Sequence, residues 1–154
     1  MHLAERIGLL YGSYSHSSEG RAAKLQQVPV ISIIDDDKSV REATKSLARS
    51  LGYNAVTFCS AEEFLGSAHM KSTACLITDV QMPGLSGIEL QERLIADGNP
   101  MPIIFITAFP NEKLQGRVLR RGAIGYLHKP VKEDNLIKCI VAALKSRGGR
   151  THGH

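Results

Sequence analysis

Short runs of branched apolar residues alternate along this chain with segments whose apolar residues recur at helical spacing. Five such pairs follow one another between residues 28 and 147. Strands that are apolar at nearly every position are typical of a parallel sheet with helices on both faces. Right-handed connections between parallel strands leave few possible topologies. The sequence therefore predicts a single α/β domain built on a doubly wound, five-stranded parallel sheet.

The boundaries of the expected elements follow from these patterns and from turn and cap signals. The expected strands are residues 30–34, 54–58, 74–79, 102–107 and 124–128, and the expected helices are residues 39–51, 60–65, 86–95, 111–121 and 133–146. Ser60, Ser86 and Asn111 stand where three of these helices begin, and their side chains suit an N-cap. Residues 1–27 are predicted to be a disordered extension, residues 28–147 the folded domain, and residues 148–154 a disordered tail.

Composition and charge exclude several classes of protein. The chain is 43% hydrophobic and 22% charged, which is ordinary for a globular protein. No apolar run approaches the roughly 20 residues of a membrane span, and Glu5 and Arg6 interrupt the start where a signal peptide would be apolar. A cytoplasmic protein without a membrane partner is expected.

The net charge of +4 does not indicate a nucleic-acid partner. The basic residues are scattered, and neither a helix-turn-helix nor a zinc-finger spacing is present, so direct binding of nucleic acid is not expected. Cys59, Cys75 and Cys139 stand at unrelated spacings and are interpreted as buried, reduced thiols.

Polar side chains stand at the ends of four of the expected strands. Asp35 and Asp36 follow the first strand, Asp79 ends the third, Thr107 ends the fourth and Lys129 follows the fifth. Because parallel strands of an open α/β sheet point their carboxyl ends to one edge, these groups are expected to meet in one pocket. Clustered carboxylates repel one another, and a divalent cation relieves that repulsion. A cation beside a lysine suits an incoming phosphoryl group.

The order and spacing of these groups resemble the receiver domain of two-component response regulators, in particular receivers paired with LuxR-type helix-turn-helix outputs. The intervals are 43 residues from Asp36 to Asp79, 28 to Thr107 and 22 to Lys129. The segments that carry the resemblance are VISIIDDDKSVRE, LITDVQMPGLSGIEL, PIIFITAF and GAIGYLHKPV. The resemblance implies a flavodoxin-like fold with strand order 2-1-3-4-5.

The resemblance also implies a phosphorelay function and a role for each site residue. Asp79 would accept a phosphoryl group from the phosphohistidine of a sensor histidine kinase. Asp36, Asp79 and the backbone carbonyl of Gln81 would bind Mg²⁺, for which Mn²⁺ substitutes, and Asp35 would contribute through water. Lys129 would pair with a phosphoryl oxygen. The chain would not be an enzyme in the usual sense, because it catalyses only its own phosphorylation and dephosphorylation.

In receivers a hydroxyl and an aromatic residue form a conformational switch, and Thr107 and Tyr126 occupy those positions here. The resemblance implies a readout face made of the helix at 111–121, the strand at 124–128 and the last helix. A second copy of this chain, bound as a homodimer after phosphorylation, is one possible partner for this face. The Lys129–Pro130 step matches one that is often cis in receivers.

Two alternatives compete with this interpretation. The segment Asp35-Asp36-Asp37-Lys38-Ser39 also fits a haloacid-dehalogenase-type phosphohydrolase, with Asp35 as the nucleophile and Asp37 as the acid and base. That class needs an acidic metal motif after Lys129 and a cap insertion, and the chain has neither. The second alternative is an interaction module that is never phosphorylated, against which the complete set of pocket residues argues. Taken singly, Asp35 and Asp36 could also be helix caps, and Lys129 a surface lysine.

Overall fold

The structure is a computed structural model that describes the backbone of residues 28–152 and the side chains of residues 28–146. The predicted N-terminal extension, residues 1–27, lies outside the described residues. Within the described part of the chain, no helix is long and apolar enough to cross a membrane.

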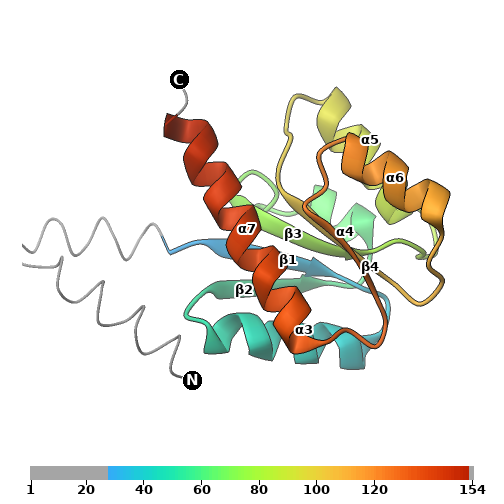
Figure 1. Cartoon of the computed structure of the whole chain (residues 1–154), viewed down its shortest axis with the longest axis horizontal. Helices are drawn as coiled ribbons and strands as arrows, with labels where there is room; N and C mark the ends of the chain where they lie inside the picture. The colour runs from blue at the N-terminus through green and yellow to red at the C-terminus, as the bar shows by residue number, and fades with distance from the viewer. Residues whose placement is uncertain (1–27, 153–154) are drawn as a thin grey trace, which may run out of the picture.

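The strands form one parallel sheet with the order β2-β1-β3-β4-β5, as the resemblance implies (Figure 1). They are β1 Val30–Ile34, β2 Asn54–Phe58, β3 Thr73–Asp79, β4 Ile103–Thr107 and β5 Gly125–His128. Every residue of β3 and β4 is buried, which explains why most of their residues are apolar. The prediction of a doubly wound parallel sheet is confirmed.

Within the described residues, four helices connect successive strands and a fifth follows the last strand, and together they cover both faces of the sheet. They are α3 Lys38–Ser50, α4 Ala61–Leu65, α5 Gly87–Ala96, α6 Glu112–Arg120 and α7 Glu133–His152. One core cluster joins the sheet to α4, α5 and α6, where the rings of Phe58 and Phe64 meet edge to face with centroids 5.4 Å apart. The other cluster joins the sheet to α3 and α7, through residues such as Ala48 and Ile140.

The helix starts agree with the capping signals in the sequence. The side chains of Asp37, Ser60, Ser86 and Asn111 each accept a hydrogen bond from a backbone N–H in the first turn of the following helix. At Ser86 the bond is reciprocated by Glu89, which completes a capping box. These local bonds stabilise the helix starts at the carboxyl edge of the sheet, where the candidate site lies.

The structure corrects the expected end of the last helix. Helix α7 continues to His152, so the predicted disordered tail at 148–154 is helical as far as that residue, and residues 153 and 154 lie outside the described part. Residues 148 and 149 within this helix are both glycine. Glycine weakens a helix by about 1 kcal/mol but keeps the backbone donor that proline removes, so the helix can continue through it.

The prediction of buried thiols is only partly correct. Cys75 is fully buried in β3, and this burial raises the pKa of its thiol to about 12. Cys139 on α7 is half-buried, whereas Cys59 is exposed where β2 ends. Cys59 follows the last residue of β2, where alternation between the faces of the sheet no longer fixes burial.

Candidate functional site

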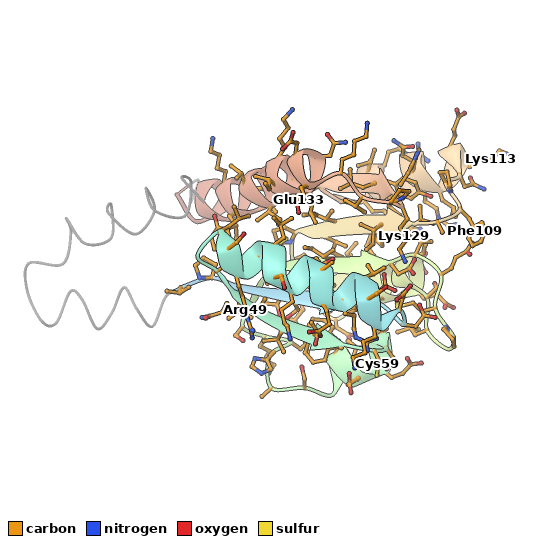
Figure 2. All side chains as sticks on the ribbon, turned by 90° about the horizontal axis from the view of Figure 1, so that it is seen from below. Arg49, Cys59, Phe109, Lys113, Lys129 and Glu133 are labelled. Atoms are coloured by element: carbon orange, nitrogen blue, oxygen red, sulfur yellow. The ribbon has the colours of Figure 1, made fainter. Side chains whose placement is uncertain are left out.

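The carboxyl edge of the sheet brings the predicted residues together. Asp35 directly follows β1, and β3, the strand beside β1 in the sheet, ends at Asp79. Strands β1 and β3 are paired up to Ile34 and Thr78, so the residues that follow these two lie side by side. Figure 2 shows Lys129 and Phe109 at this end of the molecule, with Arg49 toward the other end.

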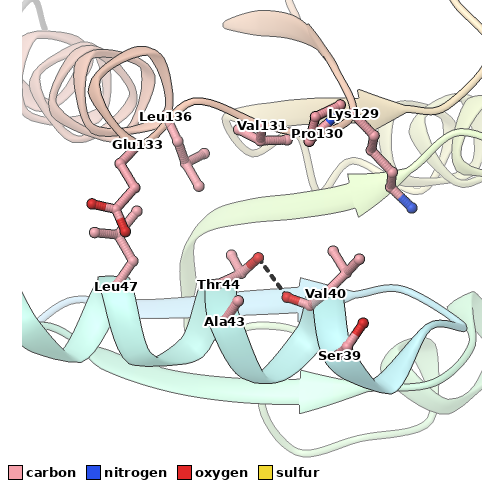
Figure 3. Close-up of a pocket in the computed structure, with 10 residues that line it drawn as sticks. All are labelled: Ser39, Val40, Ala43, Thr44, Leu47, Lys129, Pro130, Val131, Glu133 and Leu136. Atoms are coloured by element: carbon pink, nitrogen blue, oxygen red, sulfur yellow. Dashed lines mark hydrogen bonds between the residues drawn. The ribbon is translucent and has the colours of Figure 1, made fainter.

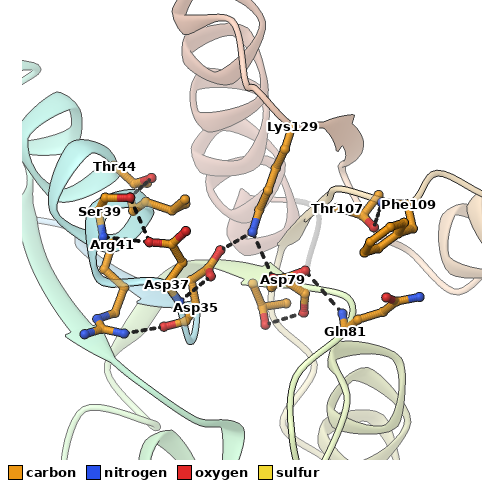
Figure 4. A network of polar contacts seen from close by, with 12 residues as sticks. Asp35, Asp37, Ser39, Arg41, Thr44, Asp79, Gln81, Thr107, Phe109 and Lys129 are labelled. Atoms are coloured by element: carbon orange, nitrogen blue, oxygen red, sulfur yellow. Dashed lines mark hydrogen bonds and ion pairs between the residues drawn. The ribbon is translucent and has the colours of Figure 1, made fainter.

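Lys129 lies between two carboxylates. Its Nζ atom is 2.9 Å from Oδ2 of Asp35 and 2.9 Å from Oδ2 of Asp79 (Figure 4). Burial by itself lowers the pKa of Lys129, but the hydrogen bonds and the negative charges of both aspartates outweigh it and raise the pKa. The lysine is therefore a fixed positive charge in the pocket at neutral pH.

Asp35 is fully buried, and its environment holds it rigidly. Its Oδ1 atom accepts a hydrogen bond of 2.9 Å from the backbone N–H of Asp37, while Oδ2 faces Lys129. Burial raises the pKa of Asp35 and the charge of Asp79 adds to the effect, whereas the bonds to Asp37 and Lys129 oppose it. One oxygen of the Asp35 carboxylate therefore fixes the position of Lys129, and the other fixes the backbone at Asp37.

The acidic residues of the pocket form a donor set suited to a divalent cation. Carboxylate oxygens of Asp35, Asp36 and Asp79 all lie within 4.8 Å of one another. These three carboxylates meet one ammonium group, so the cluster carries excess negative charge. Carboxylate oxygens are the ligands that Mg²⁺ prefers, and the residues present fit that ion.

The loop after β3 is tied to Asp79. The backbone N–H of Gln81 donates to Oδ1 of Asp79 at 3.2 Å, and the backbone N–H of Gly87 donates to the carbonyl of Val80 at 2.9 Å. A Cβ atom at Gly87 would lie only 2.3 Å from the carbonyl oxygen of Asp79. Glycine is therefore required here, because helix α5 begins in direct contact with the backbone of the candidate nucleophile.

The two predicted switch residues lie on neighbouring strands. Thr107 is fully buried, and its hydroxyl accepts a hydrogen bond of 3.0 Å from the backbone N–H of Phe109. Tyr126 is also buried, and its hydroxyl accepts a bond of 3.1 Å from the backbone N–H of Asn111, the N-cap of α6. The tyrosine thus connects β5 to the start of α6. The Lys129–Pro130 peptide bond is cis.

Sequence reasoning missed one residue of the site. Arg41 in α3 donates a hydrogen bond of 2.7 Å from Nη1 to the backbone carbonyl of Asp35. A signal was available, because a basic side chain in the first turn of a helix opposes the helix dipole and needs another reason to be there.

Asp37 is held by its own helix rather than by the pocket. Its Oδ1 atom accepts bonds from the backbone N–H and the hydroxyl of Ser39, at 2.9 and 2.7 Å. These bonds lower the pKa of Asp37. A carboxylate used as a helix cap does not suit the acid and base of a phosphohydrolase.

Comparison with known proteins agrees with this geometry. The sequence profile described as the response regulator receiver domain matches residues 31–141. The chain is 40% identical over 126 residues to the response regulator protein TmoT of Ectopseudomonas mendocina, covering 82% of this chain and 57% of TmoT. It is 36% identical over 115 residues to the transcriptional regulatory protein FixJ of Bradyrhizobium diazoefficiens, covering 75% of this chain and 56% of FixJ.

Solved structures show the same fold. The response regulator StyR aligns with a TM-score of 0.75 and 40% identity, covering 81% of this chain and 63% of StyR. FixJ-N aligns with a TM-score of 0.68 and 28% identity, covering 76% of this chain and 94% of FixJ-N. The chain therefore spans little more than half the length of the curated relatives TmoT and FixJ. The haloacid-dehalogenase alternative finds no support among these matches.

We expect the pocket to bind Mg²⁺, and Asp36→Asn to weaken that binding. Changing even the partners of metal ligands lowers affinity by roughly 10–100-fold, so loss of a ligand charge is expected to cost at least about tenfold. Calorimetric titration with MgCl₂ measures the effect. Asp37→Asn is the matched control, because asparagine also caps helices and Asp37 bonds to Ser39. Unchanged affinity in Asp36→Asn would remove Asp36 from the metal site.

Proposed function

This chain belongs to the receiver domain family of response regulators, the signalling switches of two-component phosphorelays, and from that premise we propose that Asp79 is its phosphoacceptor. The observation that carries the proposal is the position of Asp79 within 2.9 Å of Lys129 and beside Asp35 and Asp36. The donor is a phosphohistidine of a sensor histidine kinase. The chain acts in the cytoplasm and catalyses only its own phosphorylation and dephosphorylation.

The proposed reaction is a transfer between two covalent carriers. An oxygen of Asp79 attacks phosphorus, the bond from phosphorus to the histidine nitrogen breaks, and an aspartyl phosphate forms. A carboxylate is already ionised at neutral pH, so the attack needs no general base. Lys129 then pairs with an oxygen of the phosphoryl group. Asp36, Asp79 and the Gln81 carbonyl would hold Mg²⁺, with Asp35 contributing through water, and the ion would supply further charge neutralisation.

Incubation with acetyl phosphate and Mg²⁺ is expected to add one phosphoryl group to the intact protein. Mass spectrometry of the whole chain measures the increase, and Asp79→Asn is expected to abolish the alkali-labile adduct. Asp97→Asn is the matched control, since Asp97 is an exposed C-cap of α5. Full labelling of Asp79→Asn would refute the assignment of the acceptor.

A groove beside Lys129 offers a place for the phosphodonor. Its volume is about 520 Å³, and it lies between α3 and the start of α7 (Figure 3). The lining residues are Ser39, Val40, Ala43, Thr44, Leu47, Lys129, Pro130, Val131, Glu133 and Leu136. The donor histidine has to reach Asp79. Because Lys129 lines the groove and also contacts Asp79, a kinase domain bound in this groove has its histidine near the acceptor.

A charge placed in the groove is expected to block the kinase but not a small donor. Ala43 is exposed and lines the groove, so Ala43→Glu alters the surface without disturbing the core. We expect at least about a tenfold slower transfer from an autophosphorylated kinase that labels the wild-type chain, because a charge buried in an interface costs several kcal/mol. Labelling by acetyl phosphate is expected to be unchanged.

Ala142→Glu is the control for this experiment, because Ala142 is exposed on α7 and does not line the groove. Equal transfer rates for Ala43→Glu and the wild-type chain would show that the kinase binds elsewhere.

We propose further that Thr107 and Tyr126 transmit the phosphorylated state to a face made of α6, β5 and α7. Tyr126 bonds to the N-cap of α6, so a movement of its ring displaces the start of that helix. A second groove, of about 560 Å³, lies on this face between Gln115 of α6, Tyr126 of β5 and Asn135 of α7. A protein partner that reads the state of the switch, with a second copy of this chain among the candidates, is expected here rather than nucleic acid.

The lifetime of the phosphorylated state depends on water that approaches in line with the Asp79 acyl phosphate. Phe109 follows Thr107 by two residues, and its backbone is bonded to the Thr107 hydroxyl (Figure 4). Its ring is 67% exposed, so it is free to cover the opening of the phosphorylated pocket. Gln81 provides an amide on the loop after Asp79, and neither side chain is a base. Shielding by Phe109 is proposed to keep dephosphorylation slow.

Phe109→Ala is therefore expected to accelerate loss of the phosphoryl group. The decay is measured by intact mass after acetyl phosphate has been removed. Leu119→Ala serves as the control, since Leu119 is another exposed apolar residue, 40% accessible, on α6. A rate of phosphoryl loss in Phe109→Ala that equals or falls below the wild-type rate would show that Phe109 does not shield the phosphorylated pocket.

A further inference from the structure

The loop that follows Asp79 is held in place by a hydrogen bond to a residue outside the pocket. One end of the loop is fixed by Met82, which is buried in the core, and the other by Gly87 against the backbone of Asp79. Between these ends, the backbone N–H of Leu85 donates a hydrogen bond of 2.9 Å to Oε2 of Glu62, a residue 23 positions earlier.

Helix α4 gives Glu62 a rigid base. Its residues Ala61 and Phe64 are fully buried, so the short helix is fixed to the core while the carboxylate of Glu62 points outward to the loop. The hydrogen bond from Leu85 is the main reason why the pKa of Glu62 is lowered. An ionised acceptor makes a stronger hydrogen bond to a backbone N–H than a neutral one.

The loop is shaped to receive this carboxylate. Gly84 has a φ of 78°, in the left-handed region that favours glycine. A Cβ atom at Gly84 would also lie 2.6 Å from Oε2 of Glu62. The backbone conformation and the missing side chain at residue 84 together allow the contact between Glu62 and Leu85.

We infer that Glu62 is a positioning residue for the acceptor site: its carboxylate holds the loop at 81–86, and with it the backbone of Gln81 beside Asp79. This inference rests on the proposed function, because the positioned groups are those assigned to Mg²⁺ binding. Glu62 touches neither the phosphoryl group nor the metal ion. It acts by limiting the motion of a loop whose first residues bond to Asp79.

Three variants of this chain test the role of the hydrogen bond between Glu62 and Leu85. Glu62→Ala removes the acceptor, whereas Glu62→Gln removes the charge and keeps an oxygen that can accept from Leu85. Glu63→Ala is the matched control, because Glu63 is the next residue of α4 and its carboxylate accepts a bond of 2.9 Å from the backbone N–H of Cys59 instead. Calorimetry with MgCl₂ gives the affinity, and NMR gives the hydrogen exchange rate of the Leu85 amide.

Glu62→Ala is expected to raise the Kd for Mg²⁺ by about three- to tenfold, the effect of one hydrogen bond, and to accelerate exchange at Leu85. Glu62→Gln is expected to keep the Kd for Mg²⁺ and the exchange rate at Leu85 close to their wild-type values. Glu63→Ala is expected to leave both quantities unchanged. Wild-type affinity in Glu62→Ala would overturn the inference. A loss in Glu62→Gln as large as in Glu62→Ala would also overturn it, because charge rather than position would then be responsible.

The failure of this inference is distinguishable from the failure of the proposed function. If Asp79→Asn is still labelled by acetyl phosphate, the acceptor assignment is wrong whatever Glu62 does. If the wild-type chain binds Mg²⁺ and is labelled at Asp79 while Glu62→Ala behaves identically, only the positioning role is wrong.

Discussion

The bridge that Lys129 makes between Asp35 and Asp79 is the interaction on which the site depends. Asp35 is fully buried, and a buried carboxylate is costly unless it is paired and hydrogen-bonded. One of its oxygens forms an ion pair with Lys129, and the other accepts a hydrogen bond from the backbone N–H of Asp37. The same ammonium group reduces the repulsion between the first and third strands' acids. The pocket can thus hold acidic residues close together and still accept a cation and a phosphoryl anion.

The parallel sheet is the reason why these groups meet. The apolar residues of β3 and β4 are buried on both faces, so these strands cannot slide without exposing them. Their carboxyl ends are held at one edge, so Asp79 and Thr107, the last residues of these strands, stand on a rigid scaffold. The contact of Gly87 with the Asp79 backbone extends this rigidity to helix α5. Core packing and site geometry therefore have a common cause.

Two contacts hold elements around Asp79, one at the proposed switch and one at Glu62. Tyr126 connects β5 to the start of α6, whereas Glu62 connects α4 to the loop after β3. The first contact lies on the side proposed to change when Asp79 is phosphorylated. The second holds the loop that begins beside Asp79, whose first residues are proposed to take part in metal binding.

The sequence by itself determined the types of the elements, their order and the residues at the carboxyl edge, because periodicity, caps and strand ends are local properties. The cap that Asp37 forms on α3 is likewise a contact between near neighbours. Only the tertiary structure decided that Lys129 bridges two aspartates, that Arg41 bonds the Asp35 backbone and that Glu62 reaches Leu85. The Lys129–Asp79 contact joins residues 50 positions apart. Its existence depends on where β3 and β5 end along the sheet, with β4 between them. Those end points follow from the packing of whole strands and helices, which no local pattern contains.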